Sequence, residues 1–120
     1  MACPFCEFDV VLESGLAYVR YDKFPVSEGH CLIIPKRHVE TWFDMTKEEQ
    51  KEVFELIDQV KTLLDEKYSP EGYNIGMNCG EVAGQTVPHA HIHVIPRYKG
   101  DMDNPRGGVR GVISEKQNYS

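Results

Sequence analysis

One stretch of the chain decides the fold, and it reads His89-Ala90-His91-Ile92-His93-Val94-Ile95, with Pro96 directly after it. Polar and apolar residues alternate along this stretch, which is typical of a half-buried β-strand because side chains two residues apart point to the same face. Neighbouring imidazoles on that face would be about 6.5–7 Å apart. We therefore expect one face that carries the three histidines. The apolar residues between them form the opposite face, which packs into the core beneath a helix.

The one convincing helix pattern precedes the histidine stretch and covers residues 47–67. Thr46 and Glu49 have the spacing of a capping box, and Glu48 adds negative charge at the positive end of the helix dipole. Apolar residues then recur at spacings of three and four, at Val53, Leu56, Ile57, Val60, Leu63 and Leu64. This stripe predicts a core-facing side. Ser69-Pro70-Glu71-Gly72 ends the helix.

Three further segments, 17–21, 30–34 and 73–79, have the composition of strands, and turn residues separate them. Strands, one long helix and then more strands predict an α+β fold, in which one long helix packs on a mostly antiparallel sheet. The chain contains neither internal repeats nor low-complexity tracts. We expect one domain over residues 1–98 and an extended C-terminal arm with weak order over residues 99–120, where Gly, Pro, Asp, Asn and Arg are frequent.

Length and charge narrow the classes of partner. The 120 residues suffice for one domain, and 13 basic against 19 acidic residues leave a net charge of −6. A chain this acidic is not expected to bind nucleic acid, so any phosphate should be held in a local pocket. No apolar run approaches the ~20 residues of a membrane span. The first residues lack the basic-then-apolar pattern of a secretion signal, so we expect a cytoplasmic protein without a membrane partner.

Three histidines on one face point to chemistry. Imidazole can ligate a metal, transfer protons near neutral pH or act as a nucleophile, whereas Ser, Thr or Lys would serve equally well on a merely exposed strand face. The glycine-containing loop 80–87 runs directly into the histidines and offers backbone N–H groups, the Gln85 amide and the Thr86 hydroxyl to an anion. Alone, this loop is an ordinary strand connection. Beside three imidazoles it indicates phosphoryl or nucleotidyl transfer.

The stretch from Gln85 to Ile95 resembles the motif of the histidine-triad (HIT) nucleotide hydrolases and transferases, in which histidines alternate with apolar residues. Residues 29–38, Gly-His-Cys-Leu-Ile-Ile-Pro-Lys-Arg-His, resemble a second characteristic stretch of that family. With the N-terminal cysteine pair, the resemblance covers about residues 3 to 98. It implies a homodimer whose subunits join their sheets into one, each subunit with its own nucleotide site.

The resemblance also implies residue roles. His91 matches the nucleophile, which attacks the α-phosphate of a nucleotide to form a nucleotidyl-histidine that water then hydrolyses. His93 and His30 match positions that orient this nucleophile or contact phosphate, although His30 could equally be a buried polar residue at a strand start. The positions that match nucleotide-binding residues are Asp22, Asn78, Gly84, Gln85, Thr86 and His93. Asp22, which matches the ribose-binding position, has a turn-forming aspartate as its alternative.

Cys3 and Cys6 form a C-x-x-C pair, which in a chain without an export signal indicates a metal or redox site before a structural bridge. In several members of the family, the histidine after Pro-Lys-x and the first triad histidine complete a zinc site; these are His38 and His89 here. The resemblance thus implies one structural zinc per chain. A metal-free dithiol and a redox pair remain the alternatives. The lone Cys31 and Cys79 are expected to be buried hydrophobes.

The leading hypothesis is a hydrolase of dinucleoside polyphosphates, of the diadenosine tri- or tetraphosphate type. Residues 95–101 resemble that branch, and the chain lacks the Trp-Pro-Pro-Gly tail of the phosphoramidase branch. The alternatives are a nucleoside phosphoramidase, a non-catalytic nucleotide-binding scaffold protein, and a zinc enzyme that uses the triad as metal ligands. Four cations beyond the histidines, at Arg97, Lys99, Arg106 and Arg110, are expected either to meet the leaving phosphates or to be ordinary surface charges.

Overall fold

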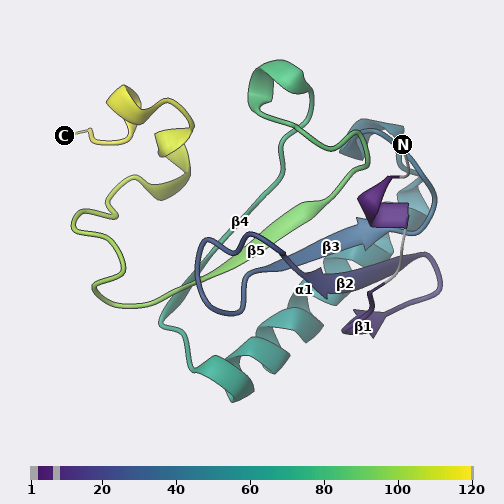
Figure 1. Ribbon diagram of the computed structural model, residues 1–120, viewed down its shortest axis with the longest axis horizontal. Coiled ribbons are helices and arrows are strands. Elements are labelled where there is room, and N and C mark those ends of the chain that lie inside the picture. The colour runs from purple at the N-terminus through teal and green to yellow at the C-terminus, as the bar shows by residue number, and fades with distance from the viewer. Residues whose placement is uncertain (1–2, 7–8, 120) are drawn as a thin grey trace.

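The computed structural model describes residues 3–6 and 9–119. Five strands form one antiparallel sheet in the order β1-β2-β3-β5-β4 (Figure 1). Their bounds are β1 Leu12–Glu13, β2 Ala17–Tyr21, β3 Cys31–Pro35, β4 Gly72–Gly76 and β5 Ile92–Arg97. With one long helix, α1 (Lys47–Tyr68), this sheet confirms the predicted α+β class. The predicted ends at Met1 and Ser120 lie outside the described residues.

The start of α1 has the predicted capping box. The Glu49 N–H donates to Thr46 Oγ1 at 3.1 Å, and the Thr46 N–H donates to Glu49 Oε1 at 2.7 Å. Glu49 is only 3% exposed, and Arg37 donates to both of its carboxylate oxygens, at 3.1 and 2.8 Å. The helix ends at Ser69, which adopts the left-handed conformation with φ of 51°. The Arg37 contact fixes the first turn of α1 to the segment that follows β3.

The two faces of the sheet have different coverings. One face packs on α1 and forms the main core, which contains Ala17, Val19, Cys31, Ile33, Ala90, Ile92 and Val94 from the sheet side. The other face carries Tyr18, Leu32 and Ile34, and Phe5 from the 3-10 helix Pro4–Cys6 packs against them. The face opposite α1 is therefore only partly covered, by the N-terminal turn. In the described part of the chain, no helix combines the length and apolarity that crossing a membrane requires.

The strand limits differ from the predicted ones. β4 ends at Gly76, so Cys79 lies in the following loop and not in a strand. β5 begins at Ile92 and continues through Pro96 to Arg97. Proline is accepted there because β3 pairs with β5 only from Ile92 to Val94, which leaves the β3 side of Pro96 free of ladder hydrogen bonds.

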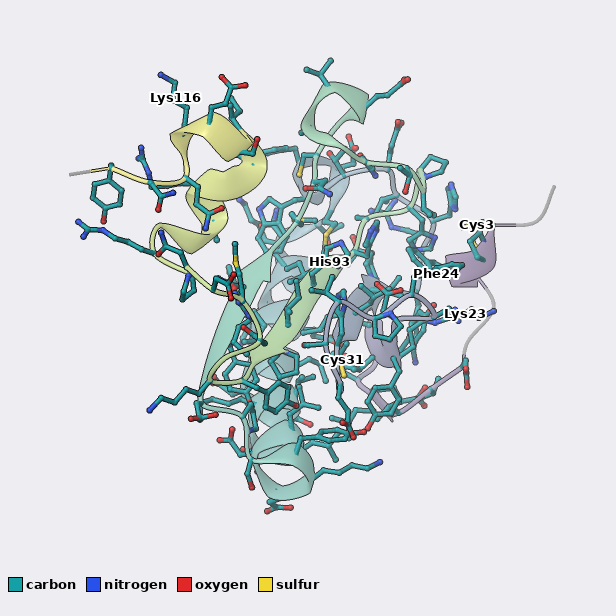
Figure 2. The ribbon with its side chains drawn as sticks, turned by 60° about the vertical axis from the view of Figure 1, so that its left-hand side comes forward. Cys3, Lys23, Phe24, Cys31, His93 and Lys116 are labelled. Atoms are coloured by element: carbon teal, nitrogen blue, oxygen red, sulfur yellow. The ribbon has the colours of Figure 1, made fainter. Side chains whose placement is uncertain are left out.

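The C-terminal segment is more structured than predicted. It contains two 3-10 helices, Gly108–Val112 and Ser114–Lys116, in place of an extended arm with weak order. Gly107 has φ of 89°, and a Cβ there would overlap the Gln117 carbonyl, so the close turn requires glycine. The segment lies at the opposite end of the molecule from the N-terminal turn (Figures 1 and 2).

Candidate active site

A cavity of about 350 Å³ lies on the sheet face opposite α1. Arg20, Leu32 and His93 form one row across its floor, because these residues are register partners on β2, β3 and β5. The cavity is lined by Pro4, Phe5, Arg20, Asp22, Lys23, Phe24, Leu32, Asn78, Gly84, Thr86, Val87, His91 and His93. The alternation of the histidine stretch thus places His91 and His93 in the cavity and their apolar neighbours in the core, as predicted. His89, the first of the three, differs from the prediction: it precedes β5, is fully buried and lies beside Cys3 and Cys6 instead of lining the cavity.

The hydrogen bonds of His91 define its tautomer. Its Nδ1 lies 2.8 Å from the main-chain carbonyl oxygen of His89. A carbonyl only accepts, so Nδ1 carries the proton and Nε2 keeps its lone pair. Burial lowers the pKa of His91 below its ordinary value of 6.5, although the bond to the carbonyl opposes this shift. The ring is therefore neutral near pH 7, with a free nitrogen lone pair in the cavity wall.

A hydrogen bond between the rings of His30 and His93 defines their tautomers. The Val26 N–H donates to His30 Nδ1 at 3.0 Å, so the proton of neutral His30 is on Nε2, which lies 3.0 Å from His93 Nδ1. His93 Nδ1 must then accept, and His93 Nε2 carries a proton. Asp22 Oδ2 lies 3.5 Å from His30 Nε2 and 4.0 Å from His93 Nδ1. Burial lowers the pKa of both histidines, while the Asp22 carboxylate raises it.

The four predicted metal ligands also come together. Cys3 Sγ and Cys6 Sγ lie 3.4 and 3.6 Å from His89 Nδ1, and Cys6 Sγ lies 3.3 Å from His38 Nδ1. All four ligand atoms are within 4.8 Å of one another. Tetrahedral zinc, with bonds of about 2.0–2.3 Å, separates its ligand atoms by about 3.3–3.8 Å. His89 Nε2 donates to the Pro35 carbonyl at 2.8 Å, so its Nδ1 lone pair faces the sulfurs. These residues could hold one zinc ion.

The loop before the histidines contributes less than predicted. Asn78, Gly84 and Thr86 line the cavity. The Gln85 side chain instead holds the loop together, because its Oε1 accepts from the Gly80 N–H at 2.8 Å and its Nε2 donates to the carbonyls of Glu40 and Val87, at 2.6 and 3.0 Å. Its amide is fully used there, so Gln85 acts on the loop's shape and not from within the cavity.

The cations of the C-terminal segment are engaged elsewhere. Arg97 pairs with Asp101 at 2.8 Å, and the guanidinium groups of Arg106 and Arg110 lie 5.2 and 4.6 Å from the Tyr119 ring centroid. None of these arginines, nor Lys99, lines the histidine cavity in the described part of the chain. The hypothesis that they meet the leaving phosphates within one chain is therefore not supported. They have the contacts of surface charges.

Sequence reasoning missed one side of the cavity. Phe5 packs edge-on against His91 with 4.8 Å between ring centroids, and Arg20, Lys23 and Phe24 line the same side. Figure 2 places Lys23, Phe24 and Cys3 to one side of His93, and Lys116 to the other. The signal in the sequence that could have indicated this side was Arg20, a charged residue within the predicted strand 17–21. Cys31 is fully buried, as predicted, and burial raises the pKa of its thiol to about 12.

Comparison with known proteins finds that residues 6–100 match the family model described as HIT domain. The chain is 43% identical over 107 residues to the protein named hit of Bacillus subtilis (strain 168), covering 82% of this chain and 74% of that one. It is 42% identical over 78 residues to the bis(5'-nucleosyl)-tetraphosphatase [asymmetrical] of Schizosaccharomyces pombe, covering 65% of this chain and 43% of that one. The chain therefore spans less than half the length of that tetraphosphatase.

The chain is also similar to a relative with a different named activity and to a solved structure. The adenosine 5'-monophosphoramidase hnt1 of Schizosaccharomyces pombe is 33% identical over 104 residues, covering 81% of this chain and 75% of that one. The crystal structure of a HIT family protein from Bacillus anthracis str. 'Ames Ancestor' is similar with a TM-score of 0.77 and 34% identity, covering 82% of this chain and 75% of that one.

Proposed function

The chain belongs to the HIT domain family, and on that premise we propose that it hydrolyses dinucleoside polyphosphates, of the diadenosine tri- or tetraphosphate type, at the α-phosphate. One observation carries the proposal: His91 is neutral, and the bond from its Nδ1–H to the His89 carbonyl leaves the Nε2 lone pair for attack. A scaffold protein that only binds nucleotides has no need of a nucleophile prepared in this way.

The reaction runs in two balanced steps. His91 Nε2 attacks the α-phosphorus, the bond from phosphorus to the bridging oxygen breaks, and the remaining nucleotide leaves with that oxygen. Positive charge develops on the His91 ring, and the His89 carbonyl oxygen, 2.8 Å from Nδ1, stabilises it. Water then attacks the same phosphorus and releases one proton to solvent, and the bond to Nε2 breaks with its electron pair returning to the ring. The nucleoside monophosphate departs and neutral His91 is restored.

The other cavity residues hold the phosphate and sugar. His93 Nε2–H is a donor because His93 Nδ1 accepts from His30, so His93 can bind a non-bridging phosphate oxygen. Gly84 has φ of 100°, a conformation that favours glycine, and it lies beside Asn78 in the cavity lining, where its backbone is available to an anion. Asp22, on the segment after β2, is the acceptor that we assign to the ribose hydroxyls.

We further propose that Cys3, Cys6, His38 and His89 bind one structural zinc ion. Three of their ligand-atom distances, 3.3 to 3.6 Å, fall in the tetrahedral range, all four atoms lie within 4.8 Å of one another, and the His89 tautomer presents its lone pair to the site. When bound, zinc would link the N-terminal turn to the segment before β5 that carries His89, and it would take no part in the phosphate chemistry. The third alternative, a catalytic zinc on the triad, is disfavoured because the lone pair of His93 Nδ1 is already occupied by His30.

The homodimer is also part of the proposal. β4 is an edge strand, and the apolar groove beside it is lined by Trp42, Phe43, Phe54, Ile57, Ile75, Met77, Cys79 and Ile92. Ile75 on this strand is 45% exposed. A second copy that pairs along β4 would satisfy the free edge and cover the groove.

Rapid-quench mass spectrometry with diadenosine tetraphosphate and with adenosine phosphoramidate tests the proposal. We expect an adenylyl adduct on His91 with both, and a higher kcat/KM for the dinucleotide. A preference for the phosphoramidate would favour the second candidate, which the 33% identical phosphoramidase supports. Hydrolysis without an adduct would exclude a covalent route. Absence of both hydrolysis and adduct would leave the scaffold function.

A further inference from the structure

Arg20 is an unexpected side chain for the floor of a nucleotide cavity. It belongs to β2, points away from α1 with Tyr18, and lines the cavity although only 4% of it is exposed. Its Nη1 donates to the Pro4 carbonyl at 3.1 Å, and it also hydrogen-bonds Tyr18. Its Nε, buried as well, has no partner among the described residues. A buried donor without a partner costs free energy, so its presence calls for an explanation.

The register of the sheet fixes where Arg20 lies relative to the chemistry. It is separated from His93 by Leu32 alone, which is two strand spacings, or about 10 Å. That distance is comparable to the length of a nucleoside monophosphate. Asp22, two residues after Arg20, lines the same cavity, and its Oδ2 lies 3.5 Å from His30 Nε2 and 4.0 Å from His93 Nδ1. With the α-phosphate at His91 and His93 and the ribose at Asp22, the base extends toward Arg20.

Two aromatic residues at the same side of the cavity can stack on a nucleobase without discriminating between bases. The Arg20 guanidinium lies 5.7 Å from the Phe5 ring centroid, and Phe24 lines the cavity while 88% exposed. Stacking on an aromatic ring is tolerant of base identity, because every base has a π-face. Selectivity must therefore come from hydrogen bonds. Of the two cations at that end, Lys23 is a point charge, whereas Arg20 carries a planar fork of donors.

A guanidinium group offers five N–H donors in a fixed fork and no acceptor. Guanine presents two adjacent acceptors, O6 and N7, which match this fork, whereas adenine presents N7 beside the donor N6–H₂. Hypoxanthine shares O6 and N7 with guanine. We propose that Arg20 reads the base in this cavity and selects nucleotides with a 6-oxopurine, such as guanine, over those with adenine. This inference rests on the proposed nucleotide site and refines its substrate class: among dinucleoside polyphosphates, those with guanine bind more tightly than the diadenosine compounds, which remain substrates.

Isothermal titration calorimetry of the full chain with GMP, IMP, AMP and 7-deaza-GMP tests this inference without any catalytic step. In the wild-type protein, GMP and IMP should bind about fivefold or more tighter than AMP, since a bidentate contact discriminates by at least that factor. 7-Deaza-GMP, which lacks one of the two acceptors, should lose most of the advantage. IMP that binds like AMP would contradict the role of O6.

Arg20→Met keeps the length of the side chain but removes the donors, and it should reduce the preference for GMP over AMP to within about twofold. Arg20→Lys retains the charge without the fork and should fall between these values. Lys23→Met is the matched control: it removes a neighbouring cation, so both nucleotides should weaken while their ratio persists. Loss of the Arg20 hydrogen bond to the Pro4 carbonyl could also loosen the N-terminal turn. Thermal unfolding and metal content identify variants with this structural defect.

The outcomes separate the inference from the proposed function. If AMP and GMP bind equally to the wild-type protein, or if Arg20→Met keeps the wild-type ratio, Arg20 is a structural brace and the inference is wrong. The hydrolase proposal would stand in that case, provided that dinucleotides are cleaved. If none of the four nucleotides binds, the nucleotide site itself is wrong, and both proposals fall together.

Discussion

Replacement of His91 by asparagine isolates the nucleophile from the rest of the site. The asparagine Nδ2 is attached to Cγ as the histidine Nδ1 is, so the new side chain can still donate to the His89 carbonyl, which lies 2.8 Å from the ring nitrogen of His91. What disappears is the Nε2 lone pair. We expect kcat to fall by about three orders of magnitude or more, which corresponds to about 4 kcal/mol of activation free energy.

The structural cost of this change is small by comparison. His91 is 8% exposed, and its ring contacts are to Phe5 and His93, at 4.8 and 5.1 Å between centroids. The loss of these contacts should destabilise the fold by about 1–3 kcal/mol. A domain of this size has about 5–15 kcal/mol of stability, so the variant remains folded.

Three measurements on folded His91→Asn protein test the reasoning. Steady-state kinetics gives kcat, calorimetry gives the affinity for a mononucleotide, and rapid-quench mass spectrometry detects the adduct. Affinity should stay within about tenfold of wild type, because the lost interaction is made in the transition state. A variant that retains a tenth of the wild-type kcat, or still forms an adduct, would refute the assignment of His91 as nucleophile.

Four other expectations follow from the same geometry. Burial lowers the pKa of His91 below 6.5 and the neutral ring is the reactive form, so kcat/KM should stay constant below pH 6.5 and decrease only at more acid pH. The Asp22 carboxylate raises this pKa, so Asp22→Asn should move the midpoint of the decrease to still lower pH. An unchanged midpoint would contradict the electrostatic coupling between Asp22 and His91. Cys6→Ser should lower the zinc content and reduce the free energy of unfolding by several kcal/mol. It should raise KM more than it lowers kcat, because the N-terminal turn that the metal would fix also lines the cavity. Wild-type protein without zinc by elemental analysis would exclude the metal. Ile75→Lys, at the free edge of β4, should give a monomer by light scattering from a dimeric wild type, and a monomeric wild type would end the dimer proposal. Glu49→Gln should cost about 2 kcal/mol in urea unfolding at pH 7, since one of the two oxygens that accept from Arg37 becomes an N–H₂ donor and the charge of the pair is lost. No change would show that this pair is neutral to stability.

Much of the fold could be predicted because local rules were consistent with one another. The capping box at Thr46 and Glu49 and the apolar stripe after it specify α1 without tertiary information. Period-two alternation likewise placed His91 and His93 on the face opposite the core. The strand limits could not be predicted, since they depend on which neighbours pair: Pro96 is accepted in β5 only because β3 has already diverged.

The candidate site was predictable where chemistry repeats in sequence and not where it is assembled from distant segments. The histidines and the cysteine pair are recognisable from their spacing. Phe5 joins the cavity because the N-terminal turn folds onto the sheet, and Arg20 because the sheet register places it in one row with His93; neither the turn's position nor the strand order follows from a local pattern. Gln85 shows the converse: its amide is suited to phosphate, but three backbone groups occupy it, those of Gly80 and Val87 in the loop and that of Glu40 outside it.

The dual use of His89 has a consequence for how such a protein can change over evolutionary time. The residue gives its ring to the cysteine cluster, but it gives only its main-chain carbonyl to His91. Every amino acid has that carbonyl. A substitution at position 89 can therefore remove a ligand of the proposed metal site without removing the carbonyl that orients His91, so the two properties can change independently although they meet in one residue.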